Sequence, residues 1–136
     1  MPKLPLFDRT TALLGKVLDL RTRNQQVISS NIANVDTPGY APARLEFEEG
    51  LRRAMGKGGQ ALATTRPEHL KGGGSLEAAQ AQVLRSRDRT GLGDRNGVDV
   101  DQEMIALAEN QILYEAATRM ISKKLALLKY VAQDGK

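Results

Sequence analysis

Glycine, a residue that interrupts helices, is concentrated in the middle of this chain. Eleven of the thirteen glycines lie between Gly39 and Gly97, which leaves both terminal segments nearly free of helix breakers. The sequence therefore predicts a mainly α-helical protein with the order helix, irregular middle, helix.

The N-terminal segment, from about residue 7 to residue 34, has the apolar spacing of an amphipathic helix. Its apolar residues recur at intervals close to three and four: Leu13, Leu14, Val17, Leu18, Leu20, Val27, Ile28 and Ile32. Such a helix would be about 40 Å long at a rise of about 1.5 Å per residue. Asn34 is expected to end it, because asparagine tolerates the left-handed backbone conformation found there.

The C-terminal segment has a heptad pattern. Steps of four and three residues define a seam with two polar members: Val100, Met104, Leu107, Gln111, Tyr114, Thr118, Ile121, Leu125, Leu128 and Ala132. Asp99 can cap the start of this helix, and Gln102 can reach back to it in a capping box. The segment therefore predicts a second helix, about 50 Å long.

Two helices with narrow apolar stripes expose leucine and isoleucine to water unless they pack on each other or on neighbours. Since the middle segment lets the chain turn back, an antiparallel coiled coil within one chain is the simplest arrangement. Its predicted seam consists of Leu14, Val17, Ile28, Val100, Met104, Leu107, Tyr114, Ile121, Leu125 and Leu128. We expect one domain formed by both ends, with helical segments at 1–35 and 99–136 and an irregular segment at 36–98.

The middle segment predicts only short elements. Leu45 and Phe47 alternate with charged residues and indicate a strand, and residues 47–55 have the character of a short helix. Residues 62–65 predict a second strand, and residues 75–85 have helical spacing. A largely irregular segment of this length is unusual in a compact monomer, so we expect partners to order it.

Composition argues against catalysis and against metal or cofactor binding. The chain has no cysteine, which excludes disulfides, thiolate metal sites and thiol nucleophiles. His69 is the only histidine, and nothing in the sequence places a carboxylate to orient it as a base. No apolar run approaches the roughly 20 residues needed to cross a bilayer, and we expect no cleaved signal peptide and no membrane insertion.

The formal net charge of +4 is spread mildly along the chain. One basic cluster could contact nucleic acid, formed by Arg85, Arg87, Arg89 and Arg95. Acidic residues are interspersed with these arginines, and no aromatic residue lies among them to stack on bases. A solvated loop or a protein-contact patch is the favoured interpretation, with nucleic-acid binding as the alternative.

The stretch N-I-A-N-V-D-T-P-G-Y, residues 31–40, combines a helix end with a turn. Asn31 and Asn34 lie three residues apart and project their amides from one helix face. Thr37, Pro38, Gly39 and Tyr40 fit a type II turn, because proline fixes the first central dihedral and glycine accepts the positive second one. The stretch therefore predicts a redirection of the chain, which requires no bound ligand.

This stretch resembles the N-terminal signature of the bacterial flagellar rod, hook and hook-associated axial proteins. Residues 96–116, N-G-V-D-V-D-Q-E-M-I-A-L-A-E-N-Q-I-L-Y-E-A, are similar to the C-terminal helix signature of that family. The short chain, the segment L-A-T-T-R-P-E-H-L at 62–70 and the ending I-S-K-K-L-A-L-L-K resemble its proximal rod members. One departure is Ala41-Pro42, where the family often has Lys-Ala.

The resemblance implies a structural subunit without enzymatic activity or cofactor, located in the periplasmic rod of the flagellar basal body. Its implied partners are further copies of itself, other rod proteins, the small adaptor rod protein and the MS ring protein. Such subunits pass unfolded through the flagellar type III export apparatus. The sister rod protein that follows along the proximal rod is the nearest alternative.

Overall fold

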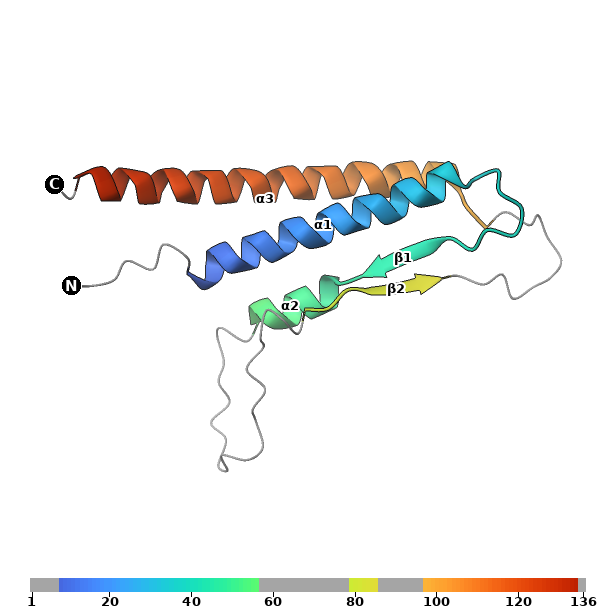
Figure 1. The fold of residues 1–136 in the computed structure, drawn as a ribbon, viewed down its shortest axis with the longest axis horizontal. Helices are drawn as coiled ribbons and strands as arrows, with labels where there is room; N and C mark the ends of the chain where they lie inside the picture. Colours follow the sequence, from blue (N-terminus) through green and yellow to red (C-terminus); the bar gives the residue numbers. More distant parts are fainter. Residues whose placement is uncertain (1–7, 57–78, 86–96, 135–136) are drawn as a thin grey trace, which may run out of the picture.

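The computed structural model describes residues 8–56, 79–85 and 97–134. Its elements along the chain are α1 (Arg9–Ala33), β1 (Ala43–Glu46), α2 (Glu48–Gly56), β2 (Gln82–Arg85) and α3 (Val100–Asp134). The two long helices pack side by side and run in opposite directions, and the small sheet and α2 lie along α1 (Figure 1). The predicted mainly α fold with paired terminal helices is confirmed.

Short side-chain caps define where the two long helices begin. Asp8 precedes α1, and its carboxylate accepts a hydrogen bond from the Thr11 backbone N–H at 2.9 Å. At α3, the Asp99 carboxylate accepts from the backbone N–H groups of Asp101 and Gln102 at 3.0 and 3.3 Å. Asp99 thus caps α3, while in the described part of the chain no hydrogen bond runs back from the Gln102 side chain to complete a capping box.

The sheet has two strands. β1 and β2 pair antiparallel, with Ala43 opposite Arg85 and Glu46 opposite Gln82. The strand at Leu45 and the short helix that follows it match the predictions. The helix predicted for residues 75–85 is wrong at 82–85, because hydrogen bonding to β1 outweighs local helical spacing there. The strand predicted at 62–65 lies outside the described residues.

A small apolar core joins α1 to the sheet. Leu20 from α1 packs with Leu45 and Phe47, and Val27 and Ala81 cover the cluster at its edge. Full burial of a side chain of this size contributes about 1.5–3 kcal/mol. Because few such residues are buried, the packing holds the sheet against α1 but leaves most of α3 outside the core.

None of the helices in the described ranges is long and apolar enough to cross a membrane.

Candidate functional site

Asn31 is the most highly connected polar residue at the end of α1. Its side chain is 1% exposed, and its Nδ2 donates to the Ala43 carbonyl at 2.8 Å and to Glu103 Oε2 at 3.1 Å. Its Oδ1 accepts from the Ala43 backbone N–H at 2.9 Å and from the Tyr40 hydroxyl at 3.1 Å. Both donors and both acceptor positions of the amide are therefore used, and one residue joins α1, the start of β1 and α3.

The turn between α1 and β1 is held by its own hydrogen bonds. The Tyr40 backbone N–H donates to the Thr37 carbonyl at 3.2 Å, and Gly39 has a φ of 73°, as a type II turn requires after Pro38. Asn34 acts locally, since its Nδ2 donates to the Ser30 carbonyl at 2.8 Å and its Oδ1 accepts from Thr37 Oγ1 at 3.2 Å. The turn thus places the Tyr40 hydroxyl within hydrogen-bond distance of Asn31 Oδ1.

The residues of α3 that face α1 include a row with a seven-residue spacing: Glu103, Asn110, Ala117 and Lys124. Asn110 is 2% exposed; its Nδ2 donates to the Arg21 carbonyl at 2.9 Å, and its Oδ1 accepts from Asn24 Nδ2 at 3.0 Å. Glu103 is held by Asn31, and Ala117 is buried. We call this set the polar row.

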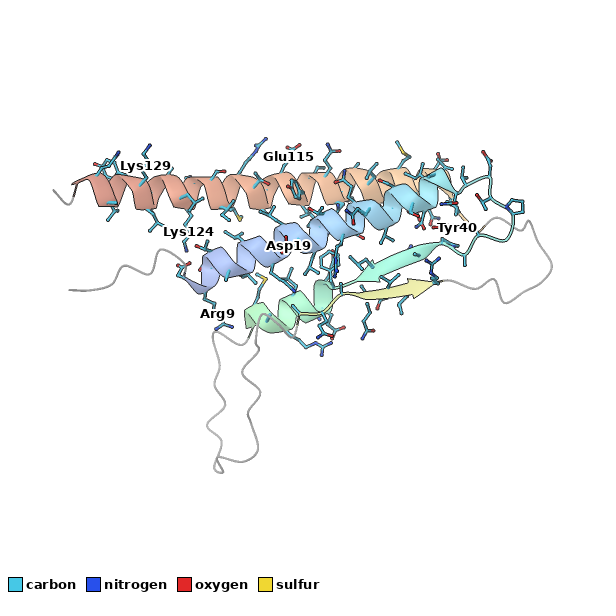
Figure 2. All side chains as sticks on the ribbon, viewed as in Figure 1. Arg9, Asp19, Tyr40, Glu115, Lys124 and Lys129 are labelled. Carbon is cyan, nitrogen blue, oxygen red and sulfur yellow. The ribbon has the colours of Figure 1, made fainter. Side chains whose placement is uncertain are left out.

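Lys124 closes the far end of the polar row. It forms an ion pair and hydrogen bond with Asp8, the residue that caps α1, and in Figure 2 it points toward the start of that helix while Glu115 and Lys129 point away. The hydrogen bond from Lys124, with the one from the Thr11 backbone, lowers the pKa of Asp8 from 3.8 to about 2. Both ends of the α1–α3 pair are therefore joined through polar contacts.

The predicted coiled-coil seam is divided between two surfaces. Ile28 is buried, and Leu14, Val17, Leu107, Ile121 and Leu128 are partly buried. Four other predicted members are exposed in the single chain: Val100, Met104, Tyr114 and Leu125. The sequence analysis did not predict the polar row. Each of its members comes one position before a member of the predicted row that contains Met104 and Leu125, and both rows repeat every seven residues.

The outer surface of α3 carries many large apolar side chains. Nine of them have between 45 and 68% of their surface exposed: Met104, Ile105, Ile112, Leu113, Met120, Leu125, Leu127, Tyr130 and Val131. We call this set the outer apolar face. Soluble monomers rarely expose apolar side chains this densely, and larger apolar patches mark contact surfaces for other macromolecules.

Arg21 connects the helix pair to α2. Its Nη2 lies 3.1 Å from Glu48 Oε1, and its guanidinium carbon lies 4.9 Å from the centre of the Phe47 ring. Arg9 adds a second link, since its Nη2 donates to the Ala54 carbonyl at 3.0 Å. These contacts orient α2 along α1 and use both arginines for structure.

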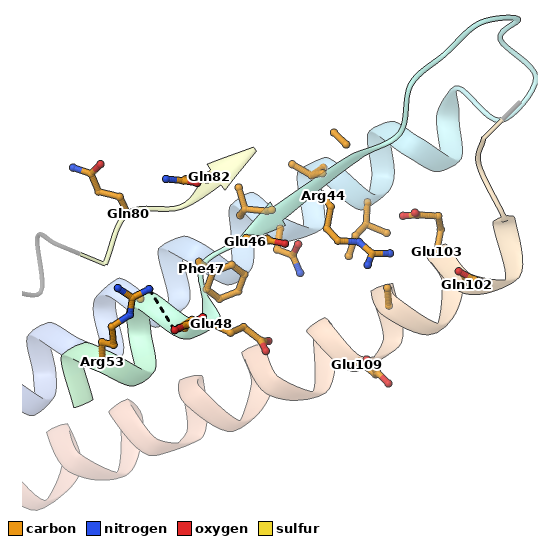
Figure 3. Close-up of a pocket in the computed structure, with 18 residues that line it drawn as sticks. Arg44, Glu46, Phe47, Glu48, Arg53, Gln80, Gln82, Gln102, Glu103 and Glu109 are labelled. Atoms are coloured by element: carbon orange, nitrogen blue, oxygen red, sulfur yellow. Dashed lines mark ion pairs between the residues drawn. The ribbon is translucent and has the colours of Figure 1, made fainter. Parts of the chain in front are cut away.

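A groove of about 790 Å³ lies between β1, α2 and α3 (Figure 3). Seven charged residues line it: Arg44, Glu46, Glu48, Glu49, Arg53, Glu103 and Glu109. Three of the carboxylates already contact Arg21, Arg53 or Asn31. Within the described ranges no three acidic or histidine side chains are grouped to hold a metal ion. Most of the residues that line the groove are polar or charged, unlike the predominantly apolar lining typical of small-molecule sites.

The remaining sequence candidates are placed only in part. Pro42 lies against the start of the α3 segment, since a Cβ added at Gly97 would be 3.3 Å from Pro42 Cδ. The departure at Ala41-Pro42 therefore coincides with a close contact between two chain segments. Arg85 is exposed in β2, while His69 and the other arginines of the basic cluster lie outside the described residues.

Comparison with known proteins identifies relatives of this chain. A family model described as "Flagella basal body rod protein" matches residues 18–40, which span the second half of α1 and the turn. The flagellar basal body rod protein FlgB of Salmonella typhimurium is 31% identical over 96% of this chain and 99% of its own length. The FlgB proteins of Bacillus subtilis and Borreliella burgdorferi are 32% and 33% identical over 98% and 84% of this chain, and over 100% and 88% of their own lengths.

The chain belongs to the FlgB family. The resemblance predicted from the two terminal signatures is confirmed, and FlgB-family membership gives the chain a structural role in the rod of the flagellar basal body. The family model covers Asn31, so the junction at the end of α1 lies within the segment that defines these rod proteins.

Proposed function

We propose that this FlgB-family chain is a subunit of the proximal rod. In this role it polymerises around the export channel and joins the MS ring and the small adaptor rod protein to the more distal rod. It reaches the periplasmic rod through the type III export apparatus and acts without catalysis. The near full-length similarity to proteins named FlgB favours this subunit over the sister rod protein that follows it.

The observation that carries the proposal is the outer apolar face of α3. The single chain leaves Ile105, Ile112 and Met120 mostly exposed although each could bury its side chain in a helix interface. The polar row already occupies the surface toward α1, so the remaining apolar surface of α3 is available to other subunits. Contacts with other copies and other rod proteins would bury it.

A pair of single substitutions tests this use of the face. Ile112→Asp places a charge on the outer apolar face, where the monomer tolerates it because the side chain is 68% exposed. In the rod the same charge would be buried without a partner, at a cost of several kcal/mol. We expect loss of swimming motility and absence of rods from isolated basal bodies, with an unchanged circular dichroism spectrum of the purified chain.

The matched control is Gln111→Asp, at an exposed polar neighbour on the same helix. It should leave motility and rods intact. Normal rods with Ile112→Asp would contradict the assignment of this face to assembly. The position along the rod is tested separately by a density map of an isolated basal body, in which this chain should be traced next to the MS ring.

A further inference from the structure

The charged residues of α3 are segregated along the helix. From Val100 to Thr118 every charged residue is acidic: Asp101, Glu103, Glu109 and Glu115. From Arg119 to Gln133 every charged residue is basic: Arg119, Lys123, Lys124 and Lys129. An acidic start and a basic end suit the helix dipole, but that effect fades within the first and last turns. The dipole therefore does not account for Glu109 and Glu115, which lie well inside the helix.

Part of this charge is available to a partner. Glu103 and Lys124 belong to the polar row, where each already has a partner near α1. Glu109, Lys123 and Lys129 are exposed, and within the described ranges none of them forms an ion pair. These exposed charges, acidic in the first half of α3 and basic in the second, can face another molecule.

Glu115 is also available, although it has a neighbour on its own helix. Its Oε2 lies 3.5 Å from Arg119 Nη2, one turn further along, and the two side chains are 57% and 83% exposed. A surface pair of this kind contributes little to stability and can exchange partners. In Figure 2 both Glu115 and Lys129 point away from α1, toward the surface of α3 that α1 does not cover.

The outer apolar face extends over both halves of α3, since Ile105 and Ile112 lie in the acidic half and Leu127 and Tyr130 in the basic half. A second copy of α3 that covers this face must therefore also meet its charges. If the two helices ran parallel in register, acids would lie level with acids and bases with bases. Like charges brought together at an interface disfavour the complex.

A shift between the two copies removes this conflict. Glu109 and Lys123 are separated by two heptads, and so are Glu115 and Lys129. A parallel copy moved by two heptads, about 21 Å at about 1.5 Å per residue, therefore brings both acids of one copy level with both lysines of the next. Because the shift is a whole number of heptads, the same side of α3 faces each neighbour.

An antiparallel pair of α3 helices centred on Ala116 would also match acids with bases. Such a pair is symmetric and closes as a dimer, whereas a staggered parallel contact uses two different surfaces and can repeat without closing. An open assembly is what a rod subunit requires, so the parallel arrangement follows from the proposed function.

Resting on that function, we propose that α3 binds the α3 of a second copy of this chain, parallel and shifted by two heptads. Glu109 and Glu115 of one copy face Lys123 and Lys129 of the next. Burial of the outer apolar face holds the copies together, and the opposite charges select the shift.

Because the chain has no cysteine, introduced cysteines report the shift directly. In the full-length variant Glu109→Cys with Lys123→Cys, the two cysteines are about 21 Å apart along one helix, so disulfides form only between chains. Mild oxidation of the concentrated protein should give a ladder of linked oligomers on non-reducing electrophoresis. The matched control is Gln102→Cys with Lys123→Cys, which moves the first cysteine by one heptad on the same side of α3. We expect linkage at least about tenfold slower in the control.

Two results would overturn the proposal. Equal rates for the two cysteine pairs, including no linkage in either, would show that the copies do not adopt this shift. A linked dimer that grows no further would show the antiparallel pair instead.

Charge reversal tests the same contact during rod assembly. Glu109→Lys and Lys123→Glu each place like charges level with one another, so each should reduce the yield of rods in isolated basal bodies several-fold. The double variant restores opposite charges and should recover the parent yield. Normal rods in both single variants, or no recovery in the double variant, would contradict the contact.

Comparison with Ile112→Asp separates this proposal from the proposed function. If Ile112→Asp prevents rods while the charge variants keep them, the chain uses its outer apolar face in the rod but with a different shift. If Ile112→Asp also leaves rods intact, the rod role of the face itself is wrong.

Discussion

The two ends of the α1–α3 pair are built in different ways. At one end, Asn31 uses its whole amide to join α1 to Ala43, Tyr40 and Glu103, and it is almost fully buried. At the other end, the pair between Asp8 and Lys124 joins the helices, and α3 continues beyond it with exposed apolar side chains. The first end has its contacts within the chain, whereas the second offers surface to other segments or subunits.

The largest expected effect on the isolated chain follows from this contrast. Asn31→Ala removes four hydrogen bonds and leaves both Ala43 backbone groups without their partner, and each buried unsatisfied group costs about 1–3 kcal/mol. We expect the free energy of unfolding in urea to fall by about 3 kcal/mol or more. The comparison variant is Asn34→Ala, which removes only local, exposed hydrogen bonds at the end of α1 and should cost about 1 kcal/mol. Similar costs for the two variants would contradict the difference between a junction and a cap.

A smaller loss of stability is expected from a substitution at Asn110, which lies between the two ends of the helix pair. Asn110→Ala leaves the Arg21 carbonyl and the Asn24 amide without their partner in the helix interface, so the free energy of unfolding should fall by about 2 kcal/mol. Gln111→Ala, at the exposed neighbouring position, should change it by no more than about 0.5 kcal/mol. If both variants unfold at the same urea concentration as the parent chain, the polar row does not stabilise the helix pair.

Features that depend on neighbouring residues were predictable from the sequence. The scarcity of glycine at both ends indicated the two long helices, and Pro38 followed by Gly39 indicated the turn that the hydrogen bond from Tyr40 to Thr37 closes. Leu45 and Phe47 indicated β1 and the start of α2 in the same way. The contacts that decide the turn lie within a few residues, and the alternation that indicated β1 is also local, although its partner strand β2 lies far along the sequence.

Local sequence patterns did not predict which side of α3 faces α1, nor that residues 82–85 form the strand β2. Asn110 contacts Arg21 across 89 positions of sequence, and Glu103 contacts Asn31 across 72. A heptad pattern is recognised from apolar residues alone, so it predicted that the row containing Met104 and Leu125 faces α1. It could not indicate the adjacent polar row, whose polar members contact polar partners on α1. Similarly, Gln82–Arg85 forms a strand because β1 lies beside it, which its own helical spacing does not reveal.

The smallest expected effect concerns the Asp8 end and depends on pH. The pKa of Asp8 is lowered from 3.8 to about 2, chiefly by Lys124, so the ionised carboxylate stabilises the folded chain above pH 3.8 and this contribution is lost as the pH falls toward 2. Asp8→Asn removes the charge but keeps a residue that caps helices well. The Tm of the parent chain should therefore exceed that of the variant at pH 7, and the difference should shrink between pH 4 and pH 2. Because Asp8 is solvent-accessible, added salt should reduce the difference at pH 7 as well. A difference in Tm that stays constant from pH 7 to pH 2 would show that Lys124 does not stabilise this end through the Asp8 charge.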